Sequence, residues 1–131
     1  MKLLPQQPYF MRAIYEWIYD NGLTPQVLID CSYDNVNVPT QYIKNNMIIF
    51  NISESATNNS LLISNEEIKF KARIDEKFLE IDAPVYAIKA IFAKEDQSVG
   101  LTFSQQIPAP IKNKKTKVKK TPFKNSKLKI V

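Results

Sequence analysis

Hydrophobic residues occupy nearly every helical position in the stretch 8–22, PYFMRAIYEWIYDNG. Its charged side chains, Arg12, Glu16 and Asp20, are spaced four residues apart and form one narrow stripe. Pro8 suits a first helical turn because it lacks an N–H that would go unbonded there, and Gly22 can take the left-handed conformation that ends a helix. This pattern predicts a helix that is buried around most of its circumference.

The breadth of that apolar surface calls for two packing partners. A single sheet covers about one face of a helix, so the remaining apolar width needs a second surface. We expect a second copy of the chain to supply it, in a homodimer whose interface includes Tyr9, Phe10, Ala13, Ile14, Trp17 and Ile18. The alternative is a helix that is wrapped by loops of its own chain.

The rest of the chain up to residue 103 reads as short strands separated by polar turns. We expect strands at 26–32, 47–52, 61–63, 67–74, 78–81 and 99–103, and a short helical turn at 84–87 that leads into a strand through residue 93. The segment 67–74, EIKFKARI, alternates apolar and mostly charged residues, so one face is core and the other faces water or a ligand. The segment 47–52, MIIFNI, is almost continuously apolar, which predicts burial on both faces. The segment 53–60 is expected to be a polar loop.

These elements define a fold class that is mostly β with one N-terminal α-helix. Brief turns between short strands favour a small, curved antiparallel barrel or sandwich. Only Gly22 and Gly100 are glycines, so the bends must come from asparagine, proline and bulges, and the pair Asn45–Asn46 is expected at positive φ. With 131 residues and 44% hydrophobic content, the chain can bury one core and not two.

The charge divides the chain into two parts. Residues 1–103 are expected to form the folded domain; they hold nine basic and thirteen acidic residues, a net charge of −4. Residues 104–131 hold nine lysines, no acidic residue and three prolines, which predicts a disordered basic tail. The tail ends in Leu128, Ile130 and Val131, an apolar cluster that is typical of a short linear motif on a flexible tether.

Composition argues against catalysis. The chain has no histidine, one cysteine (Cys31) and two glycines, which removes the commonest general base, the usual zinc sites and a glycine-rich phosphate loop. We therefore expect a binding protein without metal or cofactor. No apolar run approaches the ~20 residues that span a bilayer. The lone cysteine fits a reducing compartment, so a cytoplasmic location is expected.

Four segments together resemble one family. PYFMRAIYEWIYDNGLTP, IIFNI at 48–52, NEEIKFKARI at 65–74 and the closing KLKIV are similar to the SspB family, bacterial adaptors that deliver tagged proteins to the ClpXP protease. The resemblance covers residues 8–103 in order and the last few residues. It implies a homodimer joined through the N-terminal helix and a β domain related to Sm-like barrels. It also implies an adaptor without chemistry of its own, which binds the ssrA tag added to stalled nascent chains during ribosome rescue.

The resemblance also implies which residues bind. Ala72 matches the alanine on the floor of the family's peptide groove, and the other implied groove residues are Ile49, Asn51, Phe70, Arg73, Leu101 and Phe103. The last residues, Leu128, Lys129, Ile130 and Val131, match the end that docks on the N-terminal domain of ClpX. This tail departs from the family pattern because it is short and basic, and because no basic residue follows the apolar pair.

A nucleic-acid binder is the alternative function. A small β barrel with a lysine-rich tail can hold an RNA backbone through counterion release. Against this, the strands show no aromatic platform interleaved with arginine, and residues 1–103 are acidic. A weak, non-specific contact of the tail with ribosomal RNA is compatible with both functions.

Overall fold

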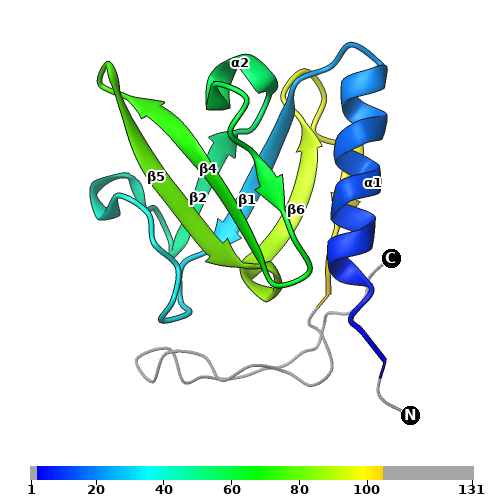
Figure 1. The fold of residues 1–131 in the computed structure, drawn as a ribbon, viewed down its shortest axis with the longest axis horizontal. Coiled ribbons are helices and arrows are strands. Elements are labelled where there is room, and N and C mark those ends of the chain that lie inside the picture. The colour runs from blue at the N-terminus through cyan, green and yellow to red at the C-terminus, as the bar shows by residue number, and fades with distance from the viewer. Residues whose placement is uncertain (1–2, 105–131) are drawn as a thin grey trace.

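The computed structural model describes residues 3–104, which form an N-terminal helix followed by seven strands in two antiparallel sheets (Figure 1). In chain order the elements are α1 (Gln7–Asp20), β1 (Pro25–Asp30), the 3-10 turn η1 (Thr40–Tyr42), β2 (Met47–Asn51), the short helix α2 (Glu54–Thr57), β3 (Leu62–Ile63), β4 (Glu67–Ile74), β5 (Lys77–Pro84), the 3-10 turn η2 (Val85–Ala87), β6 (Ile88–Ala93) and β7 (Gly100–Thr102). The predicted mostly-β class with one N-terminal helix is confirmed. The predicted tail lies outside the described residues from 105 onward.

The strands form two sheets and do not close into a barrel. One sheet has the order β2-β1-β6-β7 and the other the order β3-β4-β5. The two sheets pack across a common core, where the rings of Phe50 on β2 and Phe70 on β4 meet edge to face with centroids 5.4 Å apart. Edge-to-face aromatic pairs contribute about 0.5–1.5 kcal/mol beyond their buried area. This pair therefore ties the middle of one sheet to the edge strand of the other.

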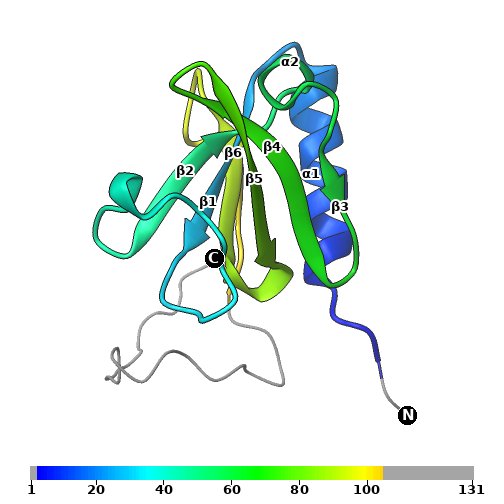
Figure 2. The same cartoon turned by 60° about the vertical axis from the view of Figure 1, so that its left-hand side comes forward.

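Helix α1 packs against both sheets on one face only. Met11 and Ile18 are fully buried in the core, and Figure 2 shows β3 lying beside the helix. Phe10 and Trp17 are 47% and 51% exposed, so the protomer leaves an apolar part of the helix uncovered. The helix was predicted with its correct limits to within one or two residues, and the structure shows which of its faces the chain itself can bury.

A buried amide fixes the start of α1 against the sheets. Gln7 is 3% exposed, and its Nε2 donates hydrogen bonds to the carbonyl oxygens of Val85 at 2.7 Å and Ile88 at 2.8 Å. These carbonyls belong to the turn η2 and the first residue of β6, far away in the sequence. Removal of a buried donor that bridges two buried acceptors lowers the stability of the fold more than removal of an exposed hydrogen bond does. The buried carbonyls cannot bond to water in place of the lost donor.

Asparagine and acidic residues make the tight turns. Asn45 and Asn46 have φ values of 54° and 63°, as expected, and Asp75 and Glu76 form the two-residue turn between β4 and β5 with φ values of 51° and 65°. Two successive left-handed residues are typical of the type I′ turn that matches the twist of a hairpin. The fold thus bends without glycine at these places.

Two local predictions were wrong. The segment 53–60 contains the helix α2, whose first turn is capped by the Ser53 Oγ accepting from the Ala56 N–H at 3.3 Å. Strand β2 is buried on one face only, because Ile49 is 48% exposed between the buried Ile48 and Phe50. A continuous apolar run therefore does not mark a strand covered on both faces here.

We predict that Gln7→Leu lowers the free energy of unfolding by about 1–3 kcal/mol, since the carbonyls of Val85 and Ile88 lose a buried donor without a large change in side-chain volume. Urea unfolding followed by far-UV circular dichroism measures this change. Gln6→Leu is the matched control: Gln6 is exposed and its side chain makes no cap hydrogen bond. Equal stability of the two variants would contradict a role for the buried amide.

Candidate groove between two open strand edges

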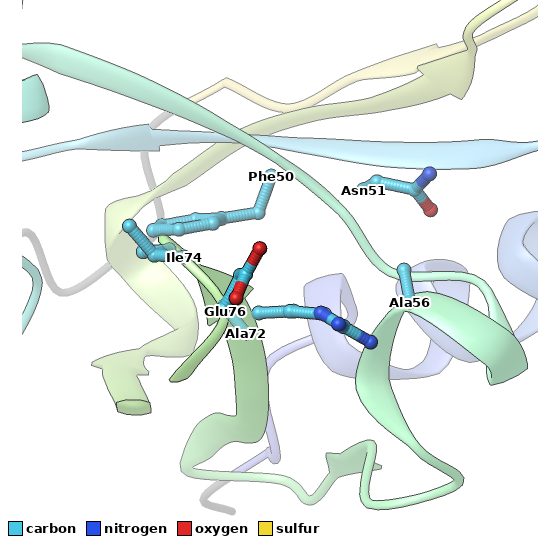
Figure 3. Close-up of a pocket in the computed structure, with 7 residues that line it drawn as sticks. Phe50, Asn51, Ala56, Ala72, Ile74 and Glu76 are labelled. Atoms are coloured by element: carbon cyan, nitrogen blue, oxygen red, sulfur yellow. The ribbon is translucent and has the colours of Figure 1, made fainter. Parts of the chain in front are cut away.

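A groove with a volume of about 460 Å³ opens where the two sheets diverge. Figure 3 shows its lining, which comes from three separate places in the fold: Phe50 and Asn51 at the end of β2, Ala56 on α2, and Ala72, Arg73, Ile74 and Glu76 at the end of β4 and in the following turn. The groove is therefore an uncovered extension of the space between the sheets.

The floor of the groove continues the hydrophobic core. Phe50 is 8% exposed and Ala72 is 5% exposed, and both side chains point to the same inner face as the buried Phe70. Along β4 the inward residues change from large to small, from Ile68 and Phe70 to Ala72. The small alanine leaves the hollow that a larger side chain would fill.

The edge of β4 is open beside the groove. The two-residue turn makes Ile74 and Lys77 a hydrogen-bonded pair, so the backbone N–H and C=O of Arg73 point away from β5. Strand β3 pairs with β4 only as far as Lys69, and the Lys71 N–H is taken by the Ser60 Oγ at 2.8 Å. The main chain at Arg73 is thus directed to an edge that no strand of residues 3–104 covers.

The edge of β2 is open in the same way. The Ile52 N–H donates to Pro25 O at 2.9 Å and the Cys31 N–H to Asn46 O at 2.7 Å, which fixes the alternation of bonds between β1 and β2. By that alternation Ile49 and Asn51 direct their backbone groups away from β1. Lys44 pairs with Met47 at the start of this edge, and beyond Met47 it has no neighbouring strand among the described residues.

The polar side chains of the groove have defined orientations. The Asn51 Oδ1 accepts from the Ser53 N–H at 2.9 Å, which holds this amide side chain at the end of β2 beside the groove. Arg73 is exposed at the rim, with its guanidinium carbon 5.9 Å from the centre of the Phe78 ring. Glu76 brings a carboxylate to the same rim. The site therefore combines an apolar floor, backbone donors and acceptors, and one charge of each sign.

Three of the seven sequence-predicted groove residues line the groove in the structure. Asn51, Ala72 and Arg73 line it, and Phe70 supports the floor through its contact with Phe50. The Ile49 side chain points to the outer face of β2, so only its backbone reaches the open edge. Leu101 and Phe103 line a different depression with Gln6 and Phe10, beside β7, which lies at the opposite edge of the four-stranded sheet from β2.

Sequence reasoning missed four lining residues. Phe50 was passed over for its neighbour Ile49, and Ala56, Ile74 and Glu76 were not considered. The alternation of inward residues, Phe70, Ala72 and Ile74, predicts that Ile74 lies on the inner face, and this pattern could have identified it as a lining residue. Ala56 and Glu76 carried no such signal because they reach the groove only through the packing of α2 and the hairpin turn.

Helix α1 carries the second candidate binding surface. Phe10, Ala13 and Trp17 are exposed and follow one another at spacings of three and four, which places them on one stripe of the helix. Ile14 is half-buried beside them, and Tyr9 is exposed with the Arg12 guanidinium carbon 4.7 Å from its ring centre. Ile18, expected in the interface, is fully buried in the protomer's core and has no surface left for a partner.

Outside the groove, burial raises the pKa values of two side chains. Burial raises the pKa of the Cys31 thiol to about 11, with the neighbouring Asp30 carboxylate adding to the effect. Burial and Asp30 likewise raise the pKa of Tyr33 to about 12. A thiol with such a pKa is protonated at neutral pH and is a poor nucleophile.

Among residues 3–104 no three histidine, cysteine or acidic side chains gather as metal ligands. None of the helices in this range is long and apolar enough to cross a membrane.

Comparison with known proteins relates this chain to one protein family. The family model described as SspB, Stringent starvation protein B, matches residues 5–128. The chain belongs to the SspB family. It is 42% identical over 95 residues to the Stringent starvation protein B homolog of Haemophilus influenzae, an alignment that covers 72% of this chain and 63% of that relative. The chain thus spans less than two thirds of the length of this SspB relative.

Proposed function

We propose that this SspB-family chain is a non-catalytic adaptor that binds the ssrA tag in the groove above Ala72 and carries the tagged chain to the ClpXP protease. The observation that supports this most directly is the hollow over a buried alanine, bordered by two strand edges whose backbone groups are open. An extended peptide satisfies such edges by adding hydrogen bonds along its own backbone, while the floor selects its side chains.

Shape and backbone bonding contribute more to this binding than charge does. The rim charges Arg73 and Glu76 are both exposed, and exposed ion pairs contribute under about 1 kcal/mol. The floor of the groove is apolar, so a small apolar side chain that sits on Phe50 and Ala72 gains burial without displacing a protein group. Affinity for the peptide should therefore depend weakly on salt.

The exposed stripe of α1 supports assembly into a homodimer. Phe10 and Trp17 lie about half exposed on one helical face, and aromatic residues of this kind are common anchors of protein interfaces. The depression that contains Leu101 and Phe103 also includes Phe10, so the apolar surface continues from the helix to the edge strand β7. A second copy of the chain would cover this surface.

The C-terminal residues supply the proposed delivery step. Leu128, Lys129, Ile130 and Val131 lie outside the described residues, and their role as a ClpX-docking motif rests on the sequence. Tethering makes capture by the unfoldase nearly intramolecular, which strengthens it by about 10² to 10⁴ without a new contact at the pore. Binding to the tag and delivery to the protease would then reside in separate parts of the chain.

We predict that Ala72→Gln weakens binding of a fluorescently labelled ssrA peptide by at least about a hundredfold, because the larger side chain fills the hollow. Fluorescence anisotropy at two salt concentrations measures it, and generic single-stranded RNA serves as the competing ligand. Ala72→Ser, which keeps the hollow, should bind within about threefold of the original chain. Full peptide affinity in Ala72→Gln, or RNA binding that is tighter than peptide binding, would contradict the assignment.

Trp17→Glu should convert the dimer to a monomer at micromolar concentration. Loss of a central aromatic anchor costs about 2–4 kcal/mol, which corresponds to roughly a 30- to 700-fold weaker dimer. Sedimentation velocity distinguishes the two states. Glu16→Gln, an exposed change on the neighbouring polar stripe, should leave the dimer intact. A monomer in the unmodified chain, or an unaltered dimer in Trp17→Glu, would show that this stripe is not the interface.

Deletion of residues 127–131 should leave peptide affinity unchanged and reduce degradation of an ssrA-tagged reporter by ClpXP to the rate seen without adaptor. The matched control deletes residues 113–117, which shortens the tail equally and keeps Leu128, Ile130 and Val131. Stimulated degradation should survive in that control. Normal stimulation by the chain that lacks residues 127–131 would place the docking motif elsewhere.

A further inference from the structure

The outer wall of the groove is the tip of the β4–β5 hairpin, residues 73–78. Ile74 and Glu76 of this tip line the groove. The tip extends past the core: Arg73, Asp75 and Glu76 are exposed and Phe78 is 44% exposed. The distance between this tip and the opposite wall sets the width available to a peptide.

The opposite wall, formed by α2, is held in several ways. Thr57 is fully buried, and its Oγ1 donates to the Ser53 carbonyl at 2.9 Å. The Ser53 Oγ caps the helix, and Glu54 accepts a hydrogen bond from the Tyr19 hydroxyl at 3.1 Å. Loss of any one of these contacts leaves the others in place, so this wall has a fixed position.

The hairpin tip, in contrast, packs on the core through Ile74 and has one side-chain hydrogen bond to another element among residues 3–104. The Tyr42 hydroxyl donates to the Asp75 Oδ2 at 2.9 Å, and this bond is the main reason that the pKa of Tyr42 lies above its ordinary value. Within residues 3–104 no other side-chain hydrogen bond joins the tip to another element. Apart from the backbone pairing of β4 with β5, the Tyr42 hydroxyl is therefore the one hydrogen-bond partner that the described part of the chain offers the tip.

Tyr42 is presented from a loop that is anchored to both sheets. Before Tyr42, Asn37 exchanges backbone hydrogen bonds with Asp82 of β5 at 2.8 and 3.2 Å. After Tyr42, Lys44 exchanges two backbone hydrogen bonds of 2.9 Å with Met47 of β2. The turn η1 between these anchors is thus a brace that spans from the edge strand of one sheet to the hairpin of the other.

The residues at the tip are unusual for their backbone conformation. Asp75 and Glu76 both have positive φ, where Asn-Gly or Asp-Gly is the usual pair because glycine has no Cβ penalty. A non-glycine residue in this region costs about 1–2 kcal/mol, and less for aspartate. Here both positions carry carboxylates: Asp75 accepts a hydrogen bond from Tyr42, and Glu76 lines the rim of the groove.

We propose that Tyr42 and Asp75 are positioning residues, whose hydrogen bond sets the width of the peptide groove by holding the hairpin tip. This inference rests on the proposed peptide-binding function and concerns residues that do not line the groove. Without the bond, the tip samples wider positions, and the bound peptide must order it again at a cost in affinity.

Tyr42→Phe keeps the ring and removes the hydroxyl. We expect it to weaken binding of the labelled ssrA peptide by about three- to tenfold, mainly through faster dissociation, with an unchanged thermal unfolding midpoint. Asp75→Gly, which suits the positive φ and removes the acceptor, should have a similar effect. Asp75→Asn keeps an acceptor oxygen at the same place and should restore affinity to within about twofold of the original.

The double variant Tyr42→Phe/Asp75→Gly provides the sharpest test. Both changes remove the same bond, so the double variant should bind no more weakly than either single one. Tyr86→Phe is the matched control, because it removes an exposed tyrosine hydroxyl that contacts Asn35 at 3.3 Å and lies away from the groove. It should bind as the original chain does.

Three outcomes separate the failure of this proposal from the failure of the proposed function. If the original chain binds the peptide and Tyr42→Phe binds equally well, the brace does not position the groove. Additive losses in the double variant would also overturn it, because the two residues would then act independently. If the original chain does not bind the peptide at all, the proposed function itself is wrong.

Discussion

The groove depends on the shortness of β3, which leaves the second half of the β4 edge without a paired strand among residues 3–104. This strand has two residues and pairs with β4 only at Ile68 and Lys69. Beyond that point the Ser60 hydroxyl satisfies one more backbone N–H, and the edge of β4 then runs free to the hairpin turn. Open strand edges are a hazard because they pair with other chains. Here the open segments are short and bordered by Arg73 and Asn51, which limits pairing to a ligand that fits between them.

The position of the groove follows from where the core ends. Phe50 and Phe70 close the space between the sheets with an edge-to-face contact. The next inward residue on β4 is Ala72, which is too small to continue that contact. Phe50 and Phe70 hold the sheets together on one side of Ala72, and the groove opens on the other side, where Ile74 forms part of its wall. A change of one residue in the inward series thus separates structural core from candidate binding site.

The elements with strong periodicity could be predicted from the sequence. Helix α1 and strand β4 have long patterns, and the structure has both elements within about two residues of their predicted limits. The exposure of Ile49 could not be predicted, because an unbroken apolar run fits one covered face as well as two. Helix α2 has four residues, too few for a period to appear. Leu101 and Phe103 were assigned to the groove from the family resemblance. The sequence alone does not give the order of strands, and β7 lies at the far edge of the sheet from β2.

The two candidate surfaces do not compete for the same residues. The exposed stripe of α1 consists of Phe10, Ala13 and Trp17, on a helix that packs beside β6, β7 and β3. The groove lies between the ends of β2 and β4, and its lining includes no residue of α1. Assembly through the helix would therefore leave both grooves of a dimer open. Two grooves and two tails in one dimer would allow one protomer to hold a peptide while either tail binds a partner. Such an arrangement would raise the effective concentration of the bound peptide near that partner, without any change in the groove itself.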